Sequence, residues 1–166
     1  YIHKRPFLLY PNTHNICCMQ KQYIAQKAIV LDETKTKILL SKYIDGKYLP
    51  KKLNGKFCMP GGRMEFGESP DNALIREIQE ETGITVTPGK PIYIWNWQYK
   101  REDDDIHIVA IARICTYKNG TIKQKIQEEG ETTLDIARWV DLKNIEIHNM
   151  VADEQPAITL FLEQQQ

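Results

Sequence analysis

The sequence predicts an α/β sandwich with a mixed β-sheet, built as one domain. Two observations point to this fold class. Segments with strand character lie both before and after a well-defined helix, and a second helical segment follows near the end of the chain. A length of 166 residues is enough for one domain with a substantial hydrophobic core. The hydrophobic content of 42% is ordinary for a globular protein, so no staple such as a disulfide framework is needed.

The first half of the chain predicts a hairpin, a loop and a sharp turn. Residues 23–33 and 37–43 are rich in β-branched and aliphatic residues and are joined by a polar turn, which is typical of two paired strands. The polar segment 44–56 predicts a surface loop. The following FCMPGG, residues 57–62, predicts a short strand that ends in a tight turn.

The best-defined helix begins after Ser69 and ends before Gly83. Ser69 suits the N-cap, Pro70 the first helical position, and Asp71 the positive end of the helix dipole. Gly83 suits the left-handed residue that commonly follows a helix.

The second half of the chain predicts three strands and a final helix. Residues 84–100 and 106–118 predict two strands around a charged turn, and the largely apolar second strand is expected near the centre of the sheet. Residues 136–142 predict a further short strand. A helix is expected over 153–165, with three apolar side chains on its inner face: Ile158, Phe161 and Leu162.

Charge and hydropathy exclude several classes of function. Lys+Arg and Asp+Glu balance at 22 each, without the basic excess typical of proteins that bind nucleic acids or membrane surfaces. No apolar run approaches the roughly 20 residues that a membrane helix needs. The cysteines show neither metal-binding spacing nor a disulfide framework, and we interpret them as small buried side chains in a reducing, cytoplasmic environment.

Three glutamates lie close together on the predicted helix. At about 100° per residue, Glu77, Glu80 and Glu81 fall within one arc beside the core face, where like charges repel unless a cation lies among them. Arg76 can neutralise part of this charge, but Glu68 adds a fourth carboxylate. Such oxygen ligands suit Mg²⁺, which often also binds substrate phosphate. The alternative is a solvated acidic face with an Arg76–Glu80 pair.

A Pro60-Gly61-Gly62 turn leads into this acidic segment. Glycines at this point allow a ligand to approach the backbone closely, and the Gly61 carbonyl can join a metal site. On its own, the turn would indicate only a tight change of chain direction.

Taken together, the segment from Gly62 to Ile84 resembles the Nudix box, G-x5-E-x7-R-E-U-x-E-E-x-G-U, where U is an aliphatic residue. Every specified position is met, by Gly62, Glu68, Arg76, Glu77, Ile78, Glu80, Glu81, Gly83 and Ile84. The FCMPGG lead-in and the later ARWVDL segment also resemble Nudix sequences. On this basis residues 23–166 form a Nudix hydrolase domain, and residues 1–22 are an extension or an extra strand.

The resemblance implies a Nudix-type α/β/α sandwich and a pyrophosphohydrolase that depends on Mg²⁺ or Mn²⁺. The expected substrate is a nucleoside diphosphate joined to another group, such as a nucleoside triphosphate, a nucleotide sugar or a dinucleoside polyphosphate. Mapped onto this chain, Glu77, Glu80, Glu81 and the Gly61 carbonyl hold metal. Glu68 supports the site, and Arg76 orients the glutamates.

The resemblance leaves the general base open. In some Nudix members it is the residue that corresponds to Glu77, and in others it is a glutamate on a later loop. Here the loop candidates are Glu128, Glu129 and Glu131, with plain surface charge as the alternative.

Substrate contacts are assigned to Arg63, Lys42 and Tyr99. The alternative role is surface solubility for the two basic residues and core packing for Tyr99. Tyr99 stands where the ADP-ribose subgroup carries proline and near where dinucleoside polyphosphate hydrolases often carry tyrosine. The partner expected is a nucleotide-type small molecule. No nucleic-acid or membrane partner is indicated, and a homodimer remains open.

Two other functions on the same fold remain alternatives. One is a catalytically silent nucleotide-binding regulatory module. The other is an enzyme similar to isopentenyl diphosphate isomerase, for which Cys58 would supply the cysteine. The intact box argues against both.

Overall fold

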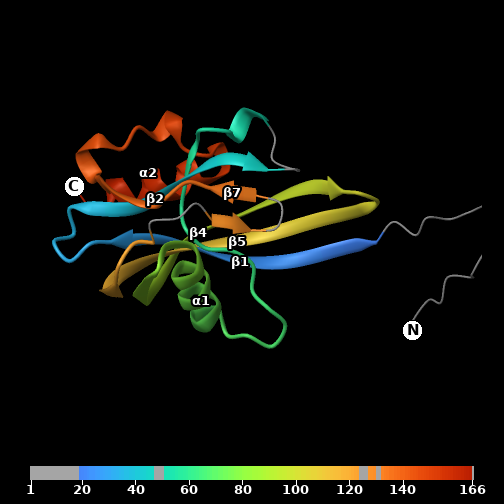
Figure 1. Ribbon diagram of the computed structural model, residues 1–166, viewed down its shortest axis with the longest axis horizontal. Coiled ribbons are helices and arrows are strands. Elements are labelled where there is room, and N and C mark those ends of the chain that lie inside the picture. Colours follow the sequence, from blue (N-terminus) through green and yellow to red (C-terminus); the bar gives the residue numbers. More distant parts are fainter. Residues whose placement is uncertain (1–18, 47–50, 124–126, 130–131, 166) are drawn as a thin grey trace, which may run out of the picture.

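The computed structural model describes residues 19–46, 51–123, 127–129 and 132–165. It contains an eight-stranded mixed sheet between two helices, α1 (Pro70–Thr82) and α2 (Gln155–Glu163), which lie on opposite sides of the sheet (Figure 1). The predicted α/β sandwich with a mixed sheet is therefore confirmed.

The strands follow the order β4-β5-β1-β2-β7-β6, and β3 and β8 also pair with β2. Their bounds are β1 Gln20–Leu31, β2 Lys37–Gly46, β3 Phe57–Cys58, β4 Ile84–Arg101, β5 Asp104–Gly120, β6 Gln127–Glu129, β7 Thr132–Leu134 and β8 Arg138–Asp141. Short 3-10 turns occur at η1 Lys51–Leu53, η2 Leu142–Asn144, η3 Ile147–Asn149 and η4 Ala152–Glu154.

Strand β5 lies between β1 and β4, as its apolar sequence predicted. It pairs with β4 in antiparallel fashion and with β1 in parallel fashion, from Gln20 opposite Asp105 to Leu31 opposite Thr116. The three strands extend together well beyond the helices in Figure 1. β1 and β5 are neighbours in space although α1 and β4 separate them in sequence.

Alternation along β1 distributes its side chains between two cores. Ile29 faces α2 and packs with Ile158 and Phe161, whereas Ala28 and Val30 pack with the apolar side of α1. Ile158 and Phe161 are fully buried and Leu162 is half-buried, as the inner face of the predicted helix requires. The α-helix itself starts at Gln155, two residues later than predicted, because a 3-10 turn precedes it.

Two stretches differ from the sequence prediction. The region after β5 contains the β6–β7 hairpin, and β7 pairs with β2. The predicted loop 44–56 begins with the last residues of β2 and includes η1.

Of the predicted extension 1–22, residues 20–22 belong to β1, and residues 1–18 lie outside the described part of the chain. No helix among the described residues is long and apolar enough to cross a membrane.

Candidate active site

Helix α1 is fixed at both ends by the residues that the sequence singled out. The Ser69 hydroxyl accepts a 3.2 Å hydrogen bond from the Asn72 amide, and Pro70 occupies the first turn. At the other end Gly83 adopts a left-handed conformation with φ 82°, and its amide donates to the Gln79 carbonyl at 3.0 Å. These local signals set where the acidic residues of α1 lie.

The turn from Met59 to Gly62 runs beside β1 and is bonded to it through the backbone. The Ala28 amide donates to the Pro60 carbonyl, and the Gln26 amide donates to the Gly62 carbonyl, both at 2.9 Å. We call residues 59–62 the glycine turn. These bonds place the glycine turn against the central part of the sheet.

Both glycines of this turn are required by close contacts. Gly61 has φ 118°, and a Cβ atom there would lie 2.3 Å from the Gln26 carbonyl oxygen. At Gly62 a Cβ atom would lie 2.4 Å from Oε2 of Glu77. The turn is therefore shaped so that the Glu77 carboxylate can lie directly against its backbone.

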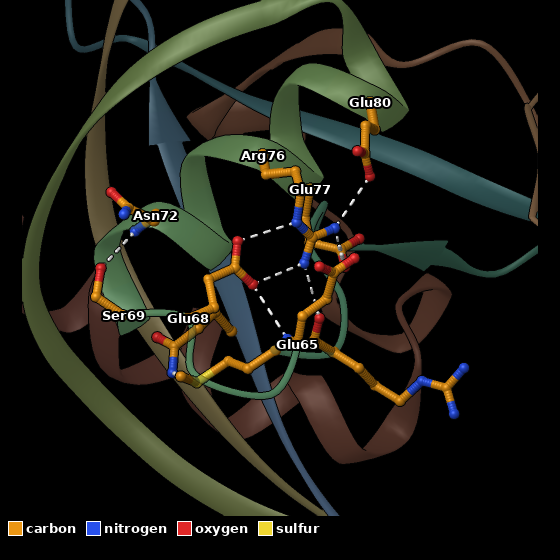
Figure 2. Close-up of polar contacts among 10 residues, drawn as sticks. Glu65, Glu68, Ser69, Asn72, Arg76, Glu77 and Glu80 are labelled. Carbon is orange, nitrogen blue, oxygen red and sulfur yellow. Dashed lines mark hydrogen bonds and ion pairs between the residues drawn. The ribbon is translucent and has the colours of Figure 1, made fainter.

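Arg76 holds the carboxylates in place, as Figure 2 shows. Its Nε and Nη2 donate to the two oxygens of Glu68, each at 3.0 Å, in a two-pronged pair. Its Nη1 donates to Glu77 at 2.9 Å and to Glu80 at 3.0 Å, and Nη2 also donates to the Arg63 carbonyl at 3.1 Å. The predicted Arg76–Glu80 pair is thus part of a larger cluster.

Charge and burial differ within this cluster. Glu77 and Glu81 are only 8% and 6% exposed, whereas 55% of the Glu80 side chain is exposed. Hydrogen bonds from Arg76 lower the pKa of Glu68, and its bonds to Glu68 raise the pKa of Arg76. Glu77 and Glu81 therefore lie at the buried edge of α1 beside the core face, as the helical arc predicted. The prediction was wrong for Glu80, whose side chain is largely exposed to solvent.

The donor set fits a hard divalent cation in its chemistry. Mg²⁺ prefers oxygen ligands, and α1 presents carboxylate oxygens on one side. The neighbouring turn has no Cβ atoms at its two glycines, which leaves space beside these oxygens. No three His, Cys, Asp or Glu side chains in the described ranges gather around one point, because Glu77 and Glu80 are turned toward Arg76 and Glu81 toward Gly61.

Residues 23–161 match the NUDIX domain family. The chain belongs to the Nudix family. The structure also aligns with a MutT Nudix hydrolase from Burkholderia pseudomallei, with a TM-score of 0.61 and 18% identity over 84% of this chain and 98% of that one. At this identity the likeness establishes the shared fold.

The Nudix relatives carry different substrates in their names. The chain is 32% identical to an ADP-ribose pyrophosphatase of Methanocaldococcus jannaschii over 68% of this chain and 59% of the relative. It is 38% identical to the 8-oxo-dGTP diphosphatase of Escherichia coli strain K12 over 28% of this chain and 45% of the relative. The aligned part thus spans about half the length of these curated relatives.

The three residues assigned to substrate contacts have different neighbours in the structure. The Arg63 guanidinium lies 4.8 Å from the centre of the Tyr23 ring, and Lys42 Nζ lies 4.5 Å from the centre of the Phe57 ring. Tyr99, like Tyr23, packs against a buried apolar cluster of β1 and β5 that contains Ile106 and Ile108. The same cluster includes Trp95 and Trp97, whose rings stack at 6.4 Å, so packing accounts for these aromatics in the structure.

The loop candidates for the general base lie at the margin of the described chain. Glu128 and Glu129 belong to β6, and their side chains are outside what the structure describes. Glu131 lies outside the described residues altogether.

Two charged residues near the glycine turn were not predicted from the sequence. Lys27 and Glu154 are 8% and 4% exposed, and both bond the backbone of Met59. A signal existed for Lys27, since a lysine within an apolar strand is unusual. Glu154 carries no comparable signal, because it lies in a polar segment far along the chain.

Proposed function

We propose that this Nudix protein hydrolyses a diphosphate linkage in a nucleoside diphosphate derivative, with Mg²⁺ or Mn²⁺ as cofactor. One observation carries the proposal. Two buried carboxylates, Glu77 and Glu81, lie against the glycine turn, one where a Cβ atom would collide and one bonded to the Gly61 amide. Burying acidic groups costs free energy, which a cation bound among them would offset.

Glu77, Glu80 and Glu81, together with the Gly61 carbonyl, would hold the metal. When bound, the metal neutralises phosphate oxygens and lowers the pKa of a bound water. Arg76 keeps Glu77 and Glu80 on the same side of α1, and Glu68 fixes the guanidinium through its two-pronged pair. Metal binding would need Glu80 to turn from Arg76, which its exposed position allows.

The proton of the attacking water would pass to a carboxylate. Glu77 is the candidate on the helix, and Glu128, Glu129 and Glu131 are the candidates near β6. Arg63 and Lys42 would offer positive charge to the substrate phosphates, and Tyr99 would lie further along the sheet. We infer nucleoside triphosphates, nucleotide sugars and dinucleoside polyphosphates as the substrates to test first.

The environment of Cys58 lends no support to the isomerase alternative. Its side chain is 1% exposed, its thiol donates to the Ser41 carbonyl, and burial raises its pKa. A buried thiol with a raised pKa is a poor nucleophile.

A metal-dependent hydrolysis screen tests the proposal. The purified protein is incubated with Mg²⁺ or Mn²⁺ and each of the following: deoxynucleoside and nucleoside triphosphates, nucleotide sugars, ADP-ribose, dinucleoside polyphosphates and NADH. We expect a metal-dependent product that contains a nucleoside monophosphate or diphosphate. Absence of turnover with every substrate, in folded protein that binds Mn²⁺, would overturn the hydrolase assignment.

A further inference from the structure

A buried ion pair holds the glycine turn from the side of the sheet opposite α1. Lys27 Nζ donates to the Met59 carbonyl at 3.1 Å, and Oε2 of Glu154 accepts from the Met59 amide at 2.7 Å. The ammonium and the carboxylate are themselves 3.9 Å apart. The backbone N–H and C=O of Met59 are thus each hydrogen-bonded to one member of the same ion pair.

The two sides of the turn are held by different parts of the chain. Lys27 belongs to β1 and Glu154 lies just before α2, whereas Glu81 on α1 bonds the Gly61 amide at 2.7 Å. Figure 1 shows α1 and α2 on opposite sides of the sheet. The backbone amides of Ala28 and Gln26 bond the carbonyls of Pro60 and Gly62 in the same turn.

A buried ion pair of this kind commonly adds little to stability, because removing both charges from water costs free energy. Its side chains are 10% and 5% exposed, and replacing such a pair by apolar groups of similar size is often neutral or stabilising. Burial raises the pKa of Glu154. Burial alone would lower the pKa of Lys27, but the nearby side chains of Tyr43, Glu154 and Glu81 raise it. A specific geometric role is one reason for such a pair to be kept.

We propose that Lys27 and Glu154 form a positioning pair that fixes Met59 and thereby aims the Gly61 carbonyl at the metal. Neither side chain would touch the metal or the substrate. The pair acts through the backbone two residues before the carbonyl that would bind the cation. The inference rests on the metal site of the proposed function and adds residues outside the Nudix box.

Two neutral double variants test the pair without leaving a lone buried charge. K27M/E154Q removes the donor to the Met59 carbonyl but keeps an amide oxygen that can accept from the Met59 amide. K27M/E154M removes both bonds. The control is K21M/D104N, which neutralises an ion pair nearer the N-terminal end of β1. Mn²⁺ affinity is measured by titration calorimetry, and folding by thermal unfolding.

We expect the Mn²⁺ dissociation constant to rise about tenfold in K27M/E154Q and further in K27M/E154M, as is common for groups that orient metal ligands. The control should bind Mn²⁺ like the parent protein. If K27M/E154M does not fold, the milder K27M/E154Q decides the question. Mn²⁺ binding within about twofold of the parent in folded K27M/E154Q would overturn the positioning role.

Mn²⁺ binding and hydrolysis by the parent protein distinguish the two proposals. A parent that binds Mn²⁺ and hydrolyses a substrate, with unchanged affinity in the variants, would refute only the positioning pair. A folded parent that binds no Mn²⁺ would refute the metal site of the proposed function and the positioning pair with it.

Discussion

The amide of Gly61 donates a 2.7 Å hydrogen bond to Oε2 of Glu81, which lies 20 residues later in the chain. This bond joins the glycine turn to the last part of α1. Because Glu81 is only 6% exposed, the bond also fixes where a buried negative charge meets the backbone. The turn and the helix therefore act as one unit.

Alanine should lower stability at Gly61 and Mn²⁺ affinity at Gly62. In Gly61→Ala, the new Cβ atom would meet a backbone oxygen at 2.3 Å, and we expect a loss of about 2 kcal/mol or more in urea unfolding. In Gly62→Ala, the Cβ atom would meet the end of the Glu77 side chain rather than backbone, so stability should change little while Mn²⁺ affinity falls about tenfold.

Gly67→Ala is the matched control for these glycines. Gly67 also has a positive φ, 81°, but a Cβ atom there would meet nothing within 4 Å. Its cost should be about 1 kcal/mol from the backbone conformation alone. A Gly61→Ala protein no less stable than Gly67→Ala would contradict the close contact.

Removing the charge of either Glu80 or Glu81 should abolish most turnover. The side-chain amide oxygen that Glu81→Gln introduces can still accept from the Gly61 amide, so both Glu80→Gln and Glu81→Gln should remain folded. We expect kcat to fall by more than about 100-fold at saturating Mg²⁺, since the charge that stabilises the reacting phosphate is lost with the metal. Glu33→Gln, at the β1–β2 turn, serves as the control. Full activity in both variants would refute the metal assignment.

Arg76→Lys should impair catalysis although the charge is kept. Lysine has no planar fork, so it cannot reproduce the two-pronged pair with Glu68 together with the bonds to Glu77 and Glu80. We expect kcat/KM to fall about 10- to 100-fold, as for other groups that orient metal ligands. Steady-state kinetics with the substrate found in the screen would show this. An unchanged kcat/KM would mean that charge alone suffices at this position.

The Asp32 carboxylate should make stability depend on acidity at the β1–β2 turn. Its Oδ1 accepts from the amides of Thr36 and Lys37 at 2.8 and 2.9 Å. Partial burial would raise the pKa of Asp32, but bonds from the Thr34 hydroxyl and these amides outweigh it and lower the pKa. A lowered pKa in the folded state means stability that is present above the unfolded value, about 3.9, and is lost as the pH falls through the folded value.

Asp32→Asn should therefore be about 1 kcal/mol less stable than the parent in urea unfolding at pH 7. The difference should shrink as the pH falls below about 3.9, because the unfolded chain then binds a proton at Asp32 more readily than the folded protein does. An equal stability of the two proteins at pH 7 would show that these bonds contribute nothing measurable.

The buried thiols should resist alkylation in the folded protein. Cys58 and Cys115 are each 1% exposed, and burial raises the pKa of Cys115 to about 11. Iodoacetamide should leave both unlabelled under native conditions and label both in urea, as peptide mass mapping would show. Cys17 and Cys18 lie outside the described residues. Rapid native labelling of Cys58 would reopen the isomerase alternative.

Local signals in the sequence predicted the helix and the long strands well. The caps Ser69 and Gly83 act on their own neighbours, so α1 follows from sequence alone. Apolar runs likewise predicted β4 and β5 to within a few residues. The β6–β7 hairpin escaped prediction because each strand has three residues and depends on β2 for its place in the sheet.

Within the site, sequence spacing predicted contacts along α1 but not contacts across the fold. The Arg76–Glu80 pair follows from a four-residue separation on a helix. The bonds of Arg76 to Glu68 and to the Arg63 carbonyl depend on the shape of the loop before α1. The meeting of Lys27 with Glu154 depends on how α2 packs on the sheet, which no local pattern encodes.

The parallel pairing of β1 with β5 has a consequence for the order of folding. β1 finds its partner only after the whole box, α1 and β4 have been synthesised, since Gln20 pairs with Asp105 and Leu31 with Thr116. Closing so long a segment costs chain entropy before any contact repays it, so folding should be slow for a chain of this size. The glycine turn is bonded to the backbone of β1, and a ribosome-bound chain that stops short of β5 should therefore lack an ordered metal site.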